Sequence, residues 1–206
     1  EHKMPAHDVS ALRALLAGLD PALGERPQAL NEPGRAGLEA VVRAAQAPGA
    51  LSDIITERAA DAAAALGFAL FLLAKPDQTD APCVWIRPAR ARFEIGEPYP
   101  LALLQSGLAP ERLIHVRAAN PAKALQAAGE AIGTRGVGWV VLESWGANAR
   151  LDLTATRRLA LAARDSGARG LILRIAAQPI SSAAPMRWRV RSGASHSPGL
   201  RLVGPA

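Results

Sequence analysis

The stretch of sequence that decides the fold is Gly49–Leu73, which reads GALSDIITERAADAAAALGFALFLL. The apolar run at 50–55 predicts a strand, and the Ala- and Leu-rich run at 59–74 predicts a long helix after a short polar turn. The stretch therefore predicts a strand–turn–helix unit.

The same alternation of strand and helix continues along the chain. The pattern predicts further helices at 38–47, 101–107, 121–133 and 153–166, and further strands at 83–87, 113–116, 139–143, 170–175 and 185–191. Strands that alternate with helices pack into a mostly parallel twisted sheet that is covered by helices on both faces. The predicted fold class is therefore α/β.

A segment of different character precedes this region. Residues 4–20 predict an N-terminal amphipathic helix. Its apolar stripe consists of Val9, Leu12, Leu15, Leu16 and Leu19. A flexible linker is expected at 21–37, a core domain at 38–192 and a flexible tail at 193–206, because prolines and glycines without periodicity surround the core. An isolated helix of this length is marginal in water, so we expect it to dock on its own domain or on a partner.

Charge, cysteine content and hydropathy limit the kinds of function that this chain can have. The chain has 206 residues, a net charge of +6 and a pI of about 10.6, and such a basic surface favours nucleic acid or acidic partners. The single cysteine, Cys83, excludes a disulfide framework and fits a reducing cytoplasm. No apolar run is long enough for a membrane span and no secretory signal opens the chain, so we expect a cytoplasmic protein without membrane contact.

The turn after the first strand lacks the residues of a phosphate-binding loop. In that loop, Gly-x-x-x-x-Gly-Lys-Ser/Thr, backbone N–H groups surround the phosphates and the Lys holds the outer ones. Counted from Thr56, the second Gly position is Asp61, the Lys position is Ala62 and the Ser/Thr position is Ala63. A carboxylate there repels phosphate, so the sequence predicts a degenerate nucleotide site.

The order and spacing of these elements resemble the core of RecA. The segments CVWIRP at 83–88, LAPERLIHVR at 108–117 and WVVLE at 139–143 fall where RecA has its later core strands and their connections. Two more segments, LDLTATRRLALAA at 151–163 and PMRWRV at 185–190, are similar to recurrent segments of the ImuA type of damage-inducible mutagenesis protein. The resemblance covers about two thirds of the chain and implies a RecA-like core.

This resemblance implies a non-catalytic accessory protein of the SOS-induced, error-prone translesion DNA synthesis machinery. The implied partners are an ImuB-like protein and a DnaE2-like polymerase, with RecA and single-stranded DNA as further candidates. RecA itself has an N-terminal helix that packs on the next protomer. The apolar stripe of residues 4–20 is therefore a candidate surface for self-association into a homo-oligomer or for a partner groove.

RecA-type hydrolysis also needs a carboxylate after the second core strand, and here that position is Ala89. Glu94 lies five residues further on, beside a Gly/Pro turn, and is a poor substitute. Glu143 stands where RecA has an acid associated with Mg²⁺, but it can equally be a strand-end acid that pairs with an arginine. We therefore expect no catalytic residue, no cofactor and no metal.

Arginines provide the candidate contacts with DNA or with an acidic partner. Alternate side chains of a strand share a face, so Arg187, Arg189 and Arg191 are expected on one side of the last strand. Arg157 and Arg158 are expected on an exposed helix face. The alternative interpretation is that both sets are solvated, with the strand charges protecting a sheet edge from aggregation.

The remaining candidates are weaker. Arg87, Arg90 and Arg92 lie near a strand end, where they could form a residual anion site. Trp145 could stack on a base, or it could pack beneath the turn that replaces the first DNA-binding loop of RecA. The second such loop would fall at 176–184, which carries no basic residue.

His115 is expected to be a hydrogen-bonded core residue and Cys83 to be inert. Two other functions remain open. One is a SulA-like cell-division inhibitor, which would also have a RecA-like fold without nucleotide chemistry. The other is a DNA-binding ATPase with a non-standard site built on Arg87 or Arg90.

Overall fold

The structure is a computed structural model that describes residues 35–74, 81–89, 91–97 and 99–193. The chain divides into two units, 1–41 and 42–206, of which the second contains the whole sheet. The N-terminal helix predicted at 4–20 lies outside the described residues. The linker prediction is wrong at its end, because helix α3 already begins at Arg35. None of the helices in the described ranges is long and apolar enough to cross a membrane.

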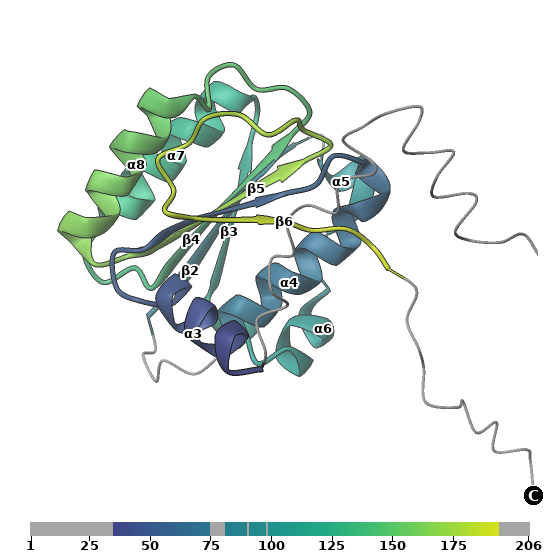
Figure 1. The fold of residues 1–206 in the computed structure, drawn as a ribbon, viewed down its shortest axis with the longest axis horizontal. Coiled ribbons are helices and arrows are strands. Elements are labelled where there is room, and N and C mark those ends of the chain that lie inside the picture. The colour runs from purple at the N-terminus through teal and green to yellow at the C-terminus, as the bar shows by residue number, and fades with distance from the viewer. Residues whose placement is uncertain (1–34, 75–80, 90, 98, 194–206) are drawn as a thin grey trace, which may run out of the picture. The chain divides into compact units, whose positions relative to one another are not determined.

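The second unit is built on a six-stranded sheet in the order β3-β2-β4-β5-β1-β6 (Figure 1). All neighbouring strands are parallel. The strands are β1 (Leu51–Ile55), β2 (Cys83–Pro88), β3 (Leu113–Ala118), β4 (Trp139–Trp145), β5 (Arg169–Ile175) and β6 (Met186–Arg189). Because every strand runs in the same direction, all six carboxyl ends lie along one edge of the sheet.

Helices cover both faces of this sheet (Figure 1). The helices are α3 (Arg35–Ala45), α4 (Ala62–Ala74), α5 (Ala91–Ile95), α6 (Pro100–Gln105), α7 (Pro121–Gly133) and α8 (Leu153–Ser166). Helices α4 and α6 pack on one face of the sheet, and α7 and α8 pack side by side on the other. The predicted class, an α/β fold with a parallel sheet between helix layers, is confirmed.

The strand sequences explain why the sheet is covered on both faces. Strand β1 is buried over its whole length, and its side chains alternate between the two cores. Ile54 belongs to the core beneath α4, and Leu51 belongs to the core beneath α7 and α8. Strand β5 is likewise buried throughout. Central strands buried on both faces are typical of parallel sheets.

Close packing beneath α7 depends on a glycine in β5. A Cβ atom on Gly170 would lie 2.5 Å from Cδ1 of Leu51 and 2.7 Å from Cδ1 of Ile132, both of which are buried. No side chain fits at that position without displacing its neighbours. Gly170 therefore lets β1 and α7 approach each other near the amino-terminal ends of β1 and β5.

Several element boundaries differ from the sequence-based predictions. Helix α5 is missed, because five residues are too few to show helical periodicity. Residues Ala59–Asp61 form a 3₁₀ turn, and the α-helix begins only at Ala62. Strand β4 continues to Trp145, two residues beyond the predicted end, because Ser144 and Trp145 still pair with β5.

Candidate functional site

The turn between β1 and α4 is the position where a phosphate-binding loop would lie. It contains two acids, Glu57 and Asp61, and the second, at the end of the 3₁₀ turn, is 1% exposed. The Asp61 carboxylate accepts hydrogen bonds from Nε of Arg58 at 3.0 Å and Nη2 of Arg58 at 2.9 Å. It also accepts the backbone N–H of Ser192 at 3.0 Å. The turn is therefore held closed by its own carboxylate.

These contacts also fix the charge of the turn. The hydrogen bond from Arg58, followed by the N–H of Ser192, holds the pKa of Asp61 well below its usual range. The group is therefore ionised at neutral pH. A nucleotide phosphate placed here would meet a carboxylate and no lysine, as the sequence predicts.

The backbone N–H groups of this turn are also engaged. The N–H of Asp61 donates to the carbonyl of Arg58 at 3.1 Å, and the N–H of Ala62 donates to the carbonyl of Ala59. In a phosphate loop such groups point at the phosphates. Here a 3₁₀ turn uses them internally, so the turn offers neither the side chains nor these N–H groups to an anion.

Glu143 lies on β4 beneath α4 and α6 and is 1% exposed. Its Oε1 accepts hydrogen bonds from Nε1 of Trp85 at 2.7 Å and from Nε of Arg87 at 2.8 Å. Burial raises the pKa of this carboxyl, although Arg87 and Trp85 act in the opposite direction. The interpretation of Glu143 as an acid that pairs with an arginine is confirmed.

The proposed anion site near the end of β2 does not form around Arg87. The Arg87 side chain is buried and paired with Glu143. Its Nη1 also donates to the carbonyl of Gly96 at 3.0 Å and lies 3.5 Å from Glu97. Arg90 lies outside the described residues. The expectation that Arg87 contributes to an anion site is wrong, because β2 points this side chain under α6 instead of toward the sheet edge.

The predicted division of faces is confirmed within β6, but the strand ends at Arg189, so Arg191 lies beyond it and not in the predicted strand. Trp188 packs against the core on the α4 side, where its ring meets Phe68 edge-on at 5.4 Å. The arginines occupy the other side. Arg187 lies 3.7 Å from the buried carboxylate of Asp53, and Arg189 lies 3.2 Å from Glu57. Two of the three guanidinium groups of the predicted arginine ladder are thus paired with acids, and only Arg191 has no ion pair among the described residues.

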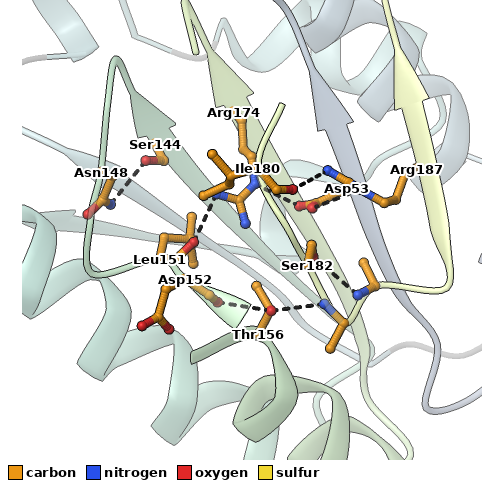
Figure 2. Close-up of polar contacts among 12 residues, drawn as sticks. Asp53, Ser144, Asn148, Leu151, Asp152, Thr156, Arg174, Ile180, Ser182 and Arg187 are labelled. Carbon is orange, nitrogen blue, oxygen red and sulfur yellow. Dashed lines mark hydrogen bonds and ion pairs between the residues drawn. The ribbon is translucent and has the colours of Figure 1, made fainter. Parts of the chain in front are cut away.

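Asp53 is the centre of a network that the sequence reading did not identify (Figure 2). Its Oδ1 accepts a hydrogen bond from Nε of Arg174 at 3.2 Å, and both side chains are at least 97% buried. Nη1 of Arg174 donates to the carbonyl of Leu151 at 3.0 Å, and Nη2 of Arg187 donates to the carbonyl of Ile180 at 2.6 Å. The available signal was one charged residue inside each of two apolar strands, LSDII and LILRI.

The connection from β5 to β6 is tied to the core at several points. The N–H of Ala177 donates to the carbonyl of Thr56 at 2.9 Å. The N–H of Ala183 donates to Oγ1 of Thr156, whose hydroxyl donates to the carbonyl of Asp152 at 3.0 Å (Figure 2). This connection occupies the place of a second DNA-binding loop, and its backbone contacts are to the protein itself.

A cavity of about 280 Å³ lies at the carboxyl ends of β2 and β4. The connections that leave these two strands run to opposite faces of the sheet, which is the usual position of ligand crevices in open α/β folds. Two of its polar side chains are engaged: Nδ2 of Asn148 donates to Oγ of Ser144 at 3.1 Å, and Asn120 caps α7 by accepting the N–H of Lys123. Two other polar atoms of the lining, Oε2 of Glu143 and Nε1 of Trp145, have no hydrogen-bond partner among the described residues. Trp145 packs against the core beneath the turn that follows β4, as expected.

The remaining candidates have ordinary structural roles. Cys83 is buried, and burial raises the pKa of its thiol to about 12. The core assignment of His115 is wrong, because β3 is an edge strand and the side chain is 21% exposed. Its Nδ1 lies 3.8 Å from Glu97, and partial burial lowers its pKa. Among the described residues, no three His, Cys, Asp or Glu side chains are grouped for a metal ion.

Arg157 and Arg158 are exposed on α8, as predicted. Arg158 lines a hollow between α7 and α8 with a volume of about 470 Å³. The apolar stripe from Val9 to Leu19 lies outside the described residues, so its role stays a prediction.

Comparison with known proteins gives matches to solved structures, one of which is described here. No family model matches the chain, and no curated protein matches it. The crystal structure of SulA from Pseudomonas aeruginosa matches with 23% sequence identity and a TM-score of 0.43. The match covers 60% of this chain and 96% of that chain. A likeness at this level carries no argument about function.

Proposed function

We propose that this chain is a non-catalytic RecA-like accessory protein that acts by binding other macromolecules. The observation that carries the proposal is the buried carboxylate of Asp61 in the turn where nucleotide phosphates would bind. Arg58 and Ser192 stabilise that carboxylate in its charged form. A protein with a parallel α/β core and this turn lacks the lysine and the glycine loop with which such proteins usually bind ATP.

The specific machinery we propose is SOS-induced translesion DNA synthesis, with an ImuB-like protein and a DnaE2-like polymerase as partners. The support is the sequence similarity of 151–163 and 185–190 to segments of ImuA-type proteins. Both segments contribute to the network around Asp53: Leu151 accepts a hydrogen bond from Arg174, and Arg187 approaches Asp53 from β6. The similar segments are therefore structural elements of this fold.

Co-purification tests the proposal directly. We expect an ImuB-like protein from the same cell to co-purify with the full chain, and a chain without residues 4–20 to lose it while keeping a folded core. The folded state of the shortened chain is checked by its unfolding curve. Failure of the full chain to retain the ImuB-like protein and the DnaE2-like polymerase would contradict the assignment.

Two phenotypes separate the proposal from the SulA-like alternative. An accessory protein of translesion synthesis is expected to change the frequency of damage-induced mutation when it is deleted. Overproduction that produces cell filaments, with a normal damage-induced mutation frequency in the deletion strain, would instead support a cell-division inhibitor.

The ATPase alternative required a non-standard phosphate site. Arg87 is one of its two proposed residues, and its guanidinium group is held by Glu143 and by the carbonyl of Gly96. An arginine buried in such a pair is not available to bind phosphate without breaking a buried ion pair, which costs about 3–5 kcal/mol.

A further inference from the structure

We propose that the hollow between α7 and α8 is a docking groove for an acidic amphipathic helix of a partner protein. The proposal deepens the proposed function and rests on it only in the claim that this chain acts by contact with other proteins. The groove lies on the face of the sheet opposite α4 and α6, where α7 and α8 run side by side (Figure 1).

The floor of the groove is apolar. Leu125 of α7 and Leu159 of α8 form its base, and Ala122 and Ala155 add only methyl groups. Gly129 of α7 also lines it, and a Cβ atom placed there would meet nothing within 4 Å. Small residues on both helices thus leave a space of about 470 Å³ that apolar side chains of a partner can fill.

The two sides of the groove differ in charge. On the α7 side, Nζ of Lys123 donates to the amide of Gln126 at 3.1 Å, and that amide donates to Glu130 at 3.0 Å. On the α8 side, Arg150 and Arg158 are exposed, and no hydrogen bond or ion pair of their side chains joins them to any described residue. The α8 side therefore presents two unpaired positive charges beside an apolar floor.

One acid, Asp152, also lies in this lining; it offsets one of the two arginine charges, so the lining keeps a net positive charge. Asp152 caps α8, and its Oδ1 accepts the N–H of Ala155 at 2.8 Å. One turn beyond Arg158 on the same helix, Leu161 is 58% exposed. The surface thus continues as an apolar side chain flanked by positive charge, which complements a helix with an apolar stripe and acidic flanks.

The dimensions favour a short helical segment. Residues Ala122 and Gly129 are seven positions apart on α7, which corresponds to about 10 Å or two turns of helix. A partner helix of that length can place its i, i+3, i+4 and i+7 side chains in the groove. The described lining contains no aromatic residue on which a base could stack, so the groove is less suited to single-stranded nucleic acid.

The test begins with a displayed library of random peptides of about twelve residues, which corresponds to about three helical turns. Selection on the full chain is expected to enrich peptides with Leu, Ile or Phe at helical spacing and with Glu or Asp beside them. Binding of a selected peptide is then measured by fluorescence anisotropy and is expected to weaken with added salt. Enrichment of basic or sequence-independent peptides would overturn the proposal.

Two variants of the chain locate the site. The double charge reversal Arg150→Glu and Arg158→Glu removes the attraction, and Gly129→Leu fills the floor with a side chain that the open space accepts. Each is expected to weaken the binding of the selected peptide by about tenfold or more, because one removes the positive charge of the groove and the other removes its open apolar floor.

The matched controls carry the same chemistry outside the groove. They are the double reversal Arg43→Glu and Arg135→Glu, and Gly133→Leu at the end of α7, where a Cβ atom also meets nothing within 4 Å. The controls are expected to bind within about twofold of the unmodified chain, since exposed charges away from an interface contribute little. Equal weakening by controls and groove variants would overturn the proposal, as would competition of an oligo-dT strand with the peptide that depends on Arg150 and Arg158.

Co-purification with the accessory partner of translesion synthesis separates this inference from the proposed function. One outcome is that the unmodified chain and the Gly129→Leu chain retain that partner equally and bind the selected peptides with equal affinity. The groove inference then fails and the proposed function stands. If the peptides bind in the groove but the partner never co-purifies, the groove inference stands and the assignment to translesion synthesis fails.

Discussion

The carboxylate of Asp61 accepts the backbone N–H of Ser192 at 3.0 Å, although the two residues are 131 positions apart in the chain. This hydrogen bond joins the turn after β1 to the segment that follows β6. Asp61 therefore has a structural role, because it fixes the turn and the segment after the last strand to each other.

Replacement of Asp61 by Asn is expected to lower the urea concentration at the midpoint of unfolding. The variant loses the charge that Arg58 pairs with and weakens the bond to the N–H of Ser192. Arg58→Gln is the matched control, and it is expected to lower the midpoint less, because the Arg58 side chain is 68% exposed. An Asp61→Asn chain as stable as the control would contradict the role of Asp61 in the fold.

The same residue predicts a dependence of stability on pH. The pKa of Asp61 is lower in the folded chain than in the unfolded chain, where an Asp has a pKa of about 3.9. Its contribution is therefore complete above pH of about 4 and is lost as the pH falls through the folded pKa. Urea unfolding at several acidic pH values checks this, since the Asp61→Asn chain should lose less stability in that range than the unmodified chain.

Glu143 predicts the opposite dependence. Burial raises the pKa of its carboxyl above the unfolded value of about 4.3, so the folded state holds this proton more tightly. The stability associated with this proton is present below pH of about 4 and is lost as the pH rises through the folded pKa. The Glu143→Gln chain has no such proton. As the pH is lowered toward 4, the unmodified chain should therefore gain stability relative to the Glu143→Gln chain. Parallel curves would contradict the raised pKa.

The ion pair between Arg87 and Glu143 predicts a non-additive pair of substitutions. Arg87→Met leaves a buried carboxylate without its cation and is expected to destabilise the fold by about 3–5 kcal/mol. Adding Glu143→Leu to Arg87→Met removes the uncompensated charge and should recover much of that loss. A double-mutant cycle in urea measures the coupling, and strictly additive effects would show that the two groups do not depend on each other.

Gly170 and Gly67 make a matched pair for the packing of the sheet. Gly170→Ala places a methyl group against Leu51 and Ile132 and is expected to cost about 1–3 kcal/mol. Gly67→Ala lies on the exposed side of α4 with nothing within 4 Å, so it should stabilise the helix by about 0.5–1 kcal/mol. Thermal unfolding of the two variants should shift in opposite directions, and a shift in the same direction would contradict this packing.

The position of the helices could be predicted well where the local sequence specifies the ends. Helix α7 begins at Pro121 after the capping residue Asn120, and α8 begins after the capping residue Asp152 and ends before Gly167. Proline at the first turn, a side-chain cap and a glycine in the left-handed conformation are local signals. The alternation of strand and helix was likewise enough to predict the parallel sheet.

The candidate site depended on contacts that local patterns do not encode. Asp53 and Arg174 are 121 positions apart and become neighbours only because β1 and β5 are adjacent in the sheet. The placement of His115 at a sheet edge follows from the strand order, which the sequence alone did not provide. The sequence indicated that Glu143 could pair with an arginine, but the identity of Arg87 as that arginine required the pairing of β2 with β4.

The central claim is that the turn closed by Asp61 does not bind a nucleotide. Titration calorimetry with ATP and Mg²⁺ tests it most directly. We expect no saturable heat for the full chain, because the turn presents a buried carboxylate and has no lysine for the outer phosphates. Saturable binding in the micromolar range that is lost when Arg58–Ala62 is altered would contradict it.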